Sequence, residues 1–174
     1  MPLRWIEANP ILTARKHKCL SHVLFPGQDT LWIDARYALR RLPDPVEWGA
    51  FSHKGNVLSS RQEFDAVDRH DRWSGESNRQ AALDMLREYA EDGFVDDAGH
   101  PETGFLVRQD TAKVRAFNEL WMAQVERCTR DQISCDYCRW KVGVAWTNIG
   151  GTAWSNPYAR LMQHEMVLPQ IYYF

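Results

Sequence analysis

The sequence predicts an α/β fold in which helices flank a mixed sheet. Residues 103–108 form a short apolar run with the length and residue types of a buried strand. Apolar residues then recur every three to four positions, as on one face of a helix: Val114, Phe117, Trp121 and Val125. A second helical pattern follows over residues 130–141. At 174 residues the chain is long enough for a sizeable core, and we expect a single domain over 1–174.

The first elements end at a candidate site residue. Asn9-Pro10 is typical of a helix cap and first turn, and the helix is expected to reach Val23. Arg15 and Lys18 lie one turn apart on this helix and point the same way. A short apolar strand over residues 30–33 then ends in Asp34. A carboxylate directly after a buried strand is a common ligand-binding position in open α/β sheets, so Asp34 is a candidate ligand-binding residue.

The middle of the chain alternates between loops, a strand and helix starts. Residues 36–45 predict a charged loop, and residues 46–52 predict a strand. The spacings Ser60…Glu63 and Ser77…Gln80 match capping boxes, so two helices are expected to begin there. Residues 65–77 predict a polar loop at one rim of the molecule.

The last helix is expected to present an acid at its start. Thr129 lies three residues before Gln132, again a capping-box spacing, which puts Asp131 in the first turn. The positive end of the helix macrodipole favours an ionised carboxylate there. Beyond this helix we expect a strand at 144–146, a glycine hinge at 148–151 and an irregular tail over 147–174.

Composition excludes some classes of protein. A formal charge of −2 argues against a nucleic-acid-binding surface. No apolar run approaches the roughly 18 residues of a membrane helix, and the N-terminus is no signal peptide, so a cytoplasmic location is expected. Eight tryptophans suit core packing or sugar platforms, because aromatic rings stack on the C–H face of a pyranose.

Cysteine usage indicates a reducing compartment rather than a disulfide framework. The four cysteines are Cys19, Cys128, Cys135 and Cys138. No second Cys-x-x-Cys and no nearby His pair completes a tetrahedral zinc site around the last two. We therefore expect buried thiols that pack like small apolar side chains, with structural zinc or redox chemistry as alternatives.

Several short motifs carry a family resemblance. They are Glu102-Thr103-Gly104 before an apolar run, Arg108, Asn118-Glu119-Leu120-Trp121, and Arg130-Asp131-Gln132-Ile133-Ser134. In these motifs the chain resembles a plant and bacterial glycosyltransferase-like family that includes mucilage-related proteins and a turgor-regulation protein. The resemblance is strongest over 14–143. More distantly, the order of elements is similar to glycogenin-like retaining enzymes, which implies a GT-A-like, nucleotide-diphospho-sugar transferase-like fold.

The resemblance implies transfer of a hexose from a nucleotide sugar to an unknown acceptor, a glycan or another molecule. The residues implied as catalytic are Asp131, Glu102 and Gln132. Those implied to bind the donor are Arg15, Lys18, Asp34, Arg36, Thr103 and Arg130. Asp34 is also the implied ligand of Mn²⁺ or Mg²⁺, and His164 stands where some GT-A enzymes have a further metal ligand.

The chain departs from the family pattern at the metal motif. It reads Asp34-Ala35-Arg36, where relatives carry Asp or Asn at the third position of the DxD-type motif. Arginine cannot bind a cation, but it can contact phosphate directly, so either it partly replaces the metal or the site is degenerate. His53 and Glu63 also match family positions, but a lone histidine is more often a hydrogen-bonded structural residue, and helix capping alone explains Glu63.

Two further expectations concern completeness and function. GT-A enzymes open with strand–helix units that hold the nucleotide base, and the resemblance begins after them. We therefore expect an N-terminally shortened domain that is a minimal enzyme, a non-catalytic descendant, or completed by another chain. An exposed sheet edge would favour a homodimer.

The alternatives to transfer are a non-catalytic protein that binds glycans or nucleotide sugars, and hydrolysis of a lipid amide, for which the sequence shows no His-rich metal centre.

Overall fold

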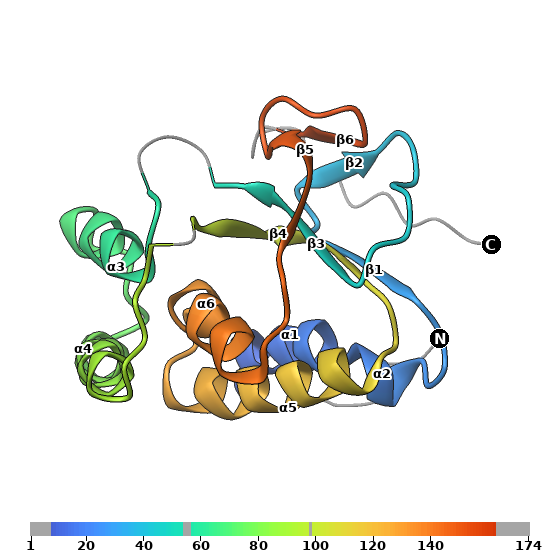
Figure 1. The fold of residues 1–174 in the computed structure, drawn as a ribbon. Coiled ribbons are helices and arrows are strands. Elements are labelled where there is room, and N and C mark those ends of the chain that lie inside the picture. The colour runs from blue at the N-terminus through green and yellow to red at the C-terminus, as the bar shows by residue number, and fades with distance from the viewer. Residues whose placement is uncertain (1–7, 54–56, 98, 163–174) are drawn as a thin grey trace.

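A computed structural model describes residues 8–53, 57–97 and 99–162, and Figure 1 shows its fold. Its strands are β1 (Thr30–Ile33), β2 (Tyr37–Leu39), β3 (Trp48–Ser52), β4 (Pro101–Arg108), β5 (Thr147–Thr152) and β6 (Ala159–Leu161). A central four-stranded sheet has the order β1-β4-β3-β5, and β2 pairs with β6 in a separate two-stranded sheet. β4 runs antiparallel to β1 and β3, whereas β5 runs parallel to β3. The sheet is therefore mixed, as predicted.

Helices flank the central sheet, which confirms the predicted α/β class. They are α1 (Pro10–Cys19), α2 (Ser21–Leu24), α3 (Ser60–Arg69), α4 (Glu76–Glu91), α5 (Ala112–Arg127) and α6 (Asp131–Val142). In Figure 1, α1, α5 and α6 lie together on one side of the sheet, and β2 and β6 lie on the other. α3 and α4 both pack against α6 and form the left end of the molecule in this view.

β4 is the centre of the fold, and each of its eight residues is buried. Leu106 faces the helices and packs in one core cluster with Trp121. Phe105 and Val107 face the other way and pack with Tyr158 beside the two-stranded sheet. A strand that is covered on both faces needs apolar residues at successive positions, which explains the continuous run in the sequence.

A third core cluster positions α3 and α4 on α6. Phe64 of α3, Met85 of α4 and Ile133 of α6 share this cluster. The ring of Tyr89 stacks on Tyr137 with centroids 3.8 Å apart. This packing sets the position of the first turn of α3 relative to the start of α6.

Two helix predictions at the N-terminal end differ in outcome. Asn9 caps α1 as predicted, and its Oδ1 accepts a hydrogen bond from the N–H of Ile11 at 2.9 Å. The helix does not continue to Val23, because Leu20 leaves the helical conformation with ψ of 41°. α1 therefore ends at Cys19, and the short α2 begins at Ser21.

The predicted capping boxes do not form at the predicted residues. Ser59 rather than Ser60 caps α3, and Ser77 lies inside α4. At α6 no side chain caps the helix. The Thr129 hydroxyl lies 3.2 Å from Oδ1 of Asn78 instead, because packing of the α3–α4 segment places this amide beside it.

The C-terminal predictions were wrong about strands. β5 covers the segment expected to be a hinge, and residues 144–146 are not a strand. Gly150 and Gly151 have φ of 104° and 84°, and the pairing of β5 with β3 shifts register beside them. β2 lies within the expected loop over 36–45, and β6 lies within the expected irregular tail.

Candidate functional site

A polar cavity of about 430 Å³ brings together segments that are far apart in the sequence. Its lining consists of Arg15, Lys18, Asp34, Arg36, His53, Arg72, Glu102, Thr103, Arg130, Asp131, Gln132 and Trp154. α1, the turn after β1, the start of β4 and the start of α6 supply most of these side chains. All nine residues that the resemblance implied as catalytic or donor-binding are among these lining residues. We call this cavity the polar cavity. His53, Arg72 and Trp154 also belong to it.

Asp131 lies at the floor of the polar cavity and is 4% exposed. Lys18, itself 1% exposed, approaches Oδ2 with its Nζ at 2.6 Å. Arg15 approaches Oδ1 with Nη2 at 3.0 Å, and the Thr103 hydroxyl donates to Oδ2 at 3.1 Å. The backbone carbonyl of Asp131 accepts a hydrogen bond from Nε1 of buried Trp121 at 2.8 Å. Both carboxylate oxygens of Asp131 are therefore occupied.

The charge of Asp131 follows from these partners. Burial alone would raise the pKa of the Asp131 carboxyl, but Arg15 and Lys18 outweigh burial and hold that pKa well below its ordinary value. The carboxylate therefore stays ionised and is a poor proton acceptor at neutral pH. Its contacts orient Lys18 and Arg15 toward the polar cavity.

Two other carboxylates, Asp34 and Glu102, lie close to Gly104. The backbone N–H of Asp34 donates to the carbonyl of Gly104 at 2.8 Å, and its Oδ1 accepts from Nε1 of Trp32 at 2.8 Å. A Cβ at position 104 would lie 3.0 Å from Oδ2 of Asp34 and 3.2 Å from Oε1 of Glu102. Glycine at this position of β4 therefore leaves room for both carboxylates.

The side chains of Arg36 and His53 lie beside Glu102. Arg36 places Nη2 3.4 Å from its Oε1, and His53 places Nε2 3.8 Å from its Oε2. His53 also lies 3.7 Å from Oε2 of Glu63. Arg130 donates to Oε1 of Glu63 from Nε at 2.9 Å and from Nη2 at 2.5 Å. Capping does not explain Glu63, because its side chain is buried and pairs with Arg130.

The lining has more positive than negative side chains, although the whole chain carries a net charge of −2. Of its twelve residues, five are Arg or Lys and three are Asp or Glu. Arg72 was not predicted as a site residue, because it falls in the polar stretch 65–77. It follows Asp71, whose positive φ of 47° forms the turn after α3. An excess of fixed cations at a solvent-accessible cavity suits an anionic ligand.

The family follows from comparison with known proteins. Residues 8–150 match the family described as TOD1/MUCI70, glycosyltransferase-like domain. The chain belongs to this family. No curated protein sequence and no solved structure shows significant similarity to the chain. The TOD1/MUCI70 match contains eleven of the twelve residues that line the polar cavity, and only Trp154 lies beyond it.

The donor set of this TOD1/MUCI70 domain limits the kind of metal site it offers. In the part of the chain that the structure describes, no three His, Cys, Asp or Glu side chains are arranged to hold a metal ion. Asp34 and Glu102 supply two carboxylates, which suit Mg²⁺ because it commonly takes one or two carboxylates together with substrate phosphates. His164 lies outside the described residues.

The cysteines pack in the core, as predicted. Cys19, Cys135 and Cys138 lie in one apolar cluster, and Cys128 lies in another. Burial raises the pKa of the Cys19 thiol to about 12 and raises the pKa of the Cys135 thiol well above its ordinary value. Protonated, buried thiols are poor nucleophiles.

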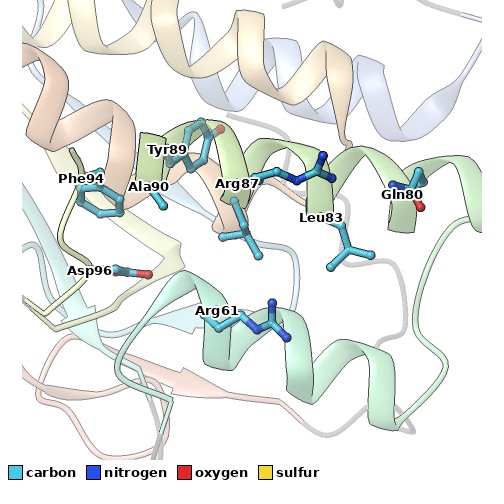
Figure 2. A pocket seen from close by; sticks show the side chains of 9 residues that line it. Arg61, Gln80, Leu83, Arg87, Tyr89, Ala90, Phe94 and Asp96 are labelled. Atoms are coloured by element: carbon cyan, nitrogen blue, oxygen red, sulfur yellow. The ribbon is translucent and has the colours of Figure 1, made fainter. Parts of the chain in front are cut away.

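A second cavity of about 530 Å³ lies between α3 and α4. Figure 2 shows Leu83 of α4 and Arg61 of α3 on the two sides of the gap between these helices, with Phe94 and Asp96 at one end of it. It is mainly apolar, and its one acid, Asp96, accepts a hydrogen bond from the backbone N–H of Ser60 at 2.6 Å. This cavity is larger than the polar cavity but lacks its convergent charges.

Within the described ranges, no helix is both long and apolar enough to span a membrane.

Proposed function

We propose that the protein is a glycosyltransferase of GT-A-like architecture that moves a hexose from a nucleotide sugar to a glycan or another acceptor. The observation that carries the proposal is the polar cavity, in which Asp34 and Glu102 meet a group of arginines at one rim of the sheet. Membership of the TOD1/MUCI70 glycosyltransferase-like family supports the same reading.

In this proposal Arg15, Arg36 and Arg72 bind the diphosphate of the donor. A guanidinium stays charged at any physiological pH and presents a fork of donors that matches phosphate oxygens. These cations also stabilise the negative charge that develops on the leaving diphosphate. Arg36, which stands where relatives carry Asp or Asn, has a side chain that is 41% exposed and reaches the cavity from the turn after β1.

Glu102 is the acid that we assign to the sugar. Both oxygens of Asp131 are engaged, so Asp131 acts as a positioning residue for Lys18 and Arg15. Glu102 faces the cavity and stabilises positive charge that develops at the anomeric carbon. Gln132, whose Nε2 donates to the carbonyl of Pro101 at 3.0 Å, is oriented to hydrogen-bond a hydroxyl of the sugar.

A divalent cation fits this arrangement only together with the donor. Asp34 would hold Mn²⁺ or Mg²⁺, and phosphate oxygens and water would supply the remaining ligands. When bound, the ion neutralises charge on the leaving diphosphate. One carboxylate oxygen of Asp34 accepts a hydrogen bond from the indole N–H of Trp32, which leaves the other oxygen for a ligand in the cavity.

The decisive experiment measures release of UDP from UDP-glucose and from UDP-galactose in the presence of Mn²⁺ or Mg²⁺. We expect the wild type to release UDP, and we expect Glu102→Gln to lower the rate about 100-fold, a typical loss when one stabilising group is removed. Glu119→Gln is the matched control, because the Glu119 side chain is 71% exposed and lies outside the cavity. Equal rates for the wild type and Glu102→Gln would remove Glu102 from the chemistry.

A second candidate function is binding without transfer. Arg36 at the Asp or Asn position of the family motif and the fully paired Asp131 favour it. A rise in melting temperature with UDP-glucose, together with no UDP release under any of these conditions, would select a nucleotide-sugar-binding protein.

A further inference from the structure

Trp154 differs from the other tryptophans that the structure describes. Its side chain belongs to the polar cavity, yet the residue is 59% exposed. Trp48 and Trp121 are fully buried, and Trp140, at 44% exposed, lies away from this cavity beside Phe94. Trp154 is therefore the tryptophan that lines the polar cavity, and more than half of its surface is exposed.

The turn that carries Trp154 is well anchored. Thr152 and Ser155 exchange two backbone hydrogen bonds of 2.9 and 3.1 Å across it. Ala153, directly before Trp154, is 2% exposed and lies in the core cluster beside the two-stranded sheet. A Cβ at Gly151 would lie 2.1 Å from the carbonyl oxygen of Ser155, so the turn closes tightly enough to require glycine there. The backbone therefore holds the indole at the mouth of the cavity.

The side chain of Asn156 strengthens this anchoring. Its Oδ1 accepts hydrogen bonds from the backbone N–H groups of Tyr158 and Ala159 at 2.9 and 2.7 Å. Its Nδ2 donates to the carbonyl of Thr152 at 3.0 Å. These bonds tie both ends of the turn to the start of β6, so presenting the indole costs little ordering entropy when a ligand arrives.

We propose that Trp154 forms the acceptor subsite, on which a neutral hexopyranose ring stacks with its C–H face. An aromatic face is the complementary surface for such a ring. This subsite rests on the proposed function, because the arginines of the cavity are assigned to the donor diphosphate. The residue is 59% exposed, so the rest of an oligosaccharide can continue outward past it.

The test compares binding of hexose oligosaccharides and of UDP by isothermal titration. The glycan probes are cellohexaose, maltohexaose and a β-1,4-linked galactohexaose. We expect the wild type to bind at least one of them, and we expect Trp154→Ala to weaken that binding about tenfold, the loss of one stacked ring. The affinity for UDP should change less than about twofold on the same scale.

Two matched variants complete the design. Trp140→Ala removes another exposed indole outside the polar cavity and should leave glycan binding unchanged. Trp154→Phe keeps an aromatic face and should retain most of the affinity. Circular dichroism of each variant verifies folding.

Three results would overturn the acceptor subsite. They are equal glycan affinity in Trp154→Ala and the wild type, no binding of any of the three glycans by the wild type, and a loss confined to UDP. The last result would assign Trp154 to the nucleotide base. Trp154-dependent glycan binding without UDP release from either donor would instead uphold the subsite and contradict the proposed transfer reaction.

Discussion

Asp131 and Lys18 illustrate how a buried ion pair organises the candidate site. Lys18 is almost fully buried, and Oδ2 of Asp131 lies 2.6 Å from its ammonium nitrogen. A buried cation without a counterion is costly, so removing one partner of such a pair destabilises much more than removing the pair. Asp131 therefore contributes to stability as well as to the arrangement of cations in the cavity.

We expect Asp131→Asn to lower the free energy of unfolding at pH 7 by about 3–5 kcal/mol, because it leaves Lys18 buried and uncompensated. Urea denaturation measures the change. Adding Lys18→Met should recover part of the loss. Asp65→Asn is the control, because Asp65 forms an exposed pair with Arg61 and should cost no more than about 0.5 kcal/mol.

The difference in the free energy of unfolding between the wild type and Asp131→Asn should depend on pH in a definite direction. The folded protein lowers the pKa of Asp131 below its unfolded value of about 3.9, so the stabilisation is fully present above about pH 4. It is lost as the pH falls toward the folded pKa. The difference in the free energy of unfolding between the wild type and Asp131→Asn should therefore be constant from pH 5 to 7 and should become smaller below about pH 4. A gap that widens on acidification would contradict this account.

Helix starts show which local signals the structure uses. Thr111 caps α5, and its side chain accepts from the N–H of Val114 at 3.2 Å. Ser77 has the sequence signature of a cap but lies exposed inside α4. A hydroxyl stabilises a helix only where it meets an unpaired N–H group, so the two residues should respond differently to the same substitution.

We expect Thr111→Ala to lower the free energy of unfolding by about 1 kcal/mol, the usual cost of losing a cap. Ser77→Ala should be neutral or slightly stabilising, since alanine has the higher helix propensity. Urea denaturation of the two variants under identical conditions measures both. A loss in Ser77→Ala as large as in Thr111→Ala would restore the capping box predicted from the sequence.

Elements with strong local signals were predictable, and those set by distant pairing were not. The apolar run of β4 and the periodic stripe of α5 identified both elements. β2, β5 and β6 carry no comparable pattern, because each exists through its pairing with a strand far away in the sequence. The same limit applies to the site, where motifs identified Asp131 and Glu102, but only folding brings Arg72 and Trp154 beside them.

The polar cavity is a property of the whole molecule, because α1, α6, β4 and the turns after β1 and α3 all contribute to it. A ligand that bridges these segments binds only the folded chain, so its binding free energy adds to the free energy of unfolding. The positive lining of a protein with net charge −2 also concentrates anions locally. Both effects can be measured with the simplest relevant anion.

Inorganic pyrophosphate should therefore stabilise the protein, because it carries the diphosphate charge of the proposed donor. At 100 times its dissociation constant it adds about 2.7 kcal/mol, which corresponds to about 5–10 °C in melting temperature for a chain of this size. We expect the shift to shrink at high salt and to be largely lost in an Arg36→Ala, Arg72→Ala double variant. Arg127→Ala is the matched control, since Arg127 pairs with Glu88 outside the cavity. Equal shifts in all three proteins would show that pyrophosphate binds elsewhere and would remove Arg36 and Arg72 from the proposed diphosphate site.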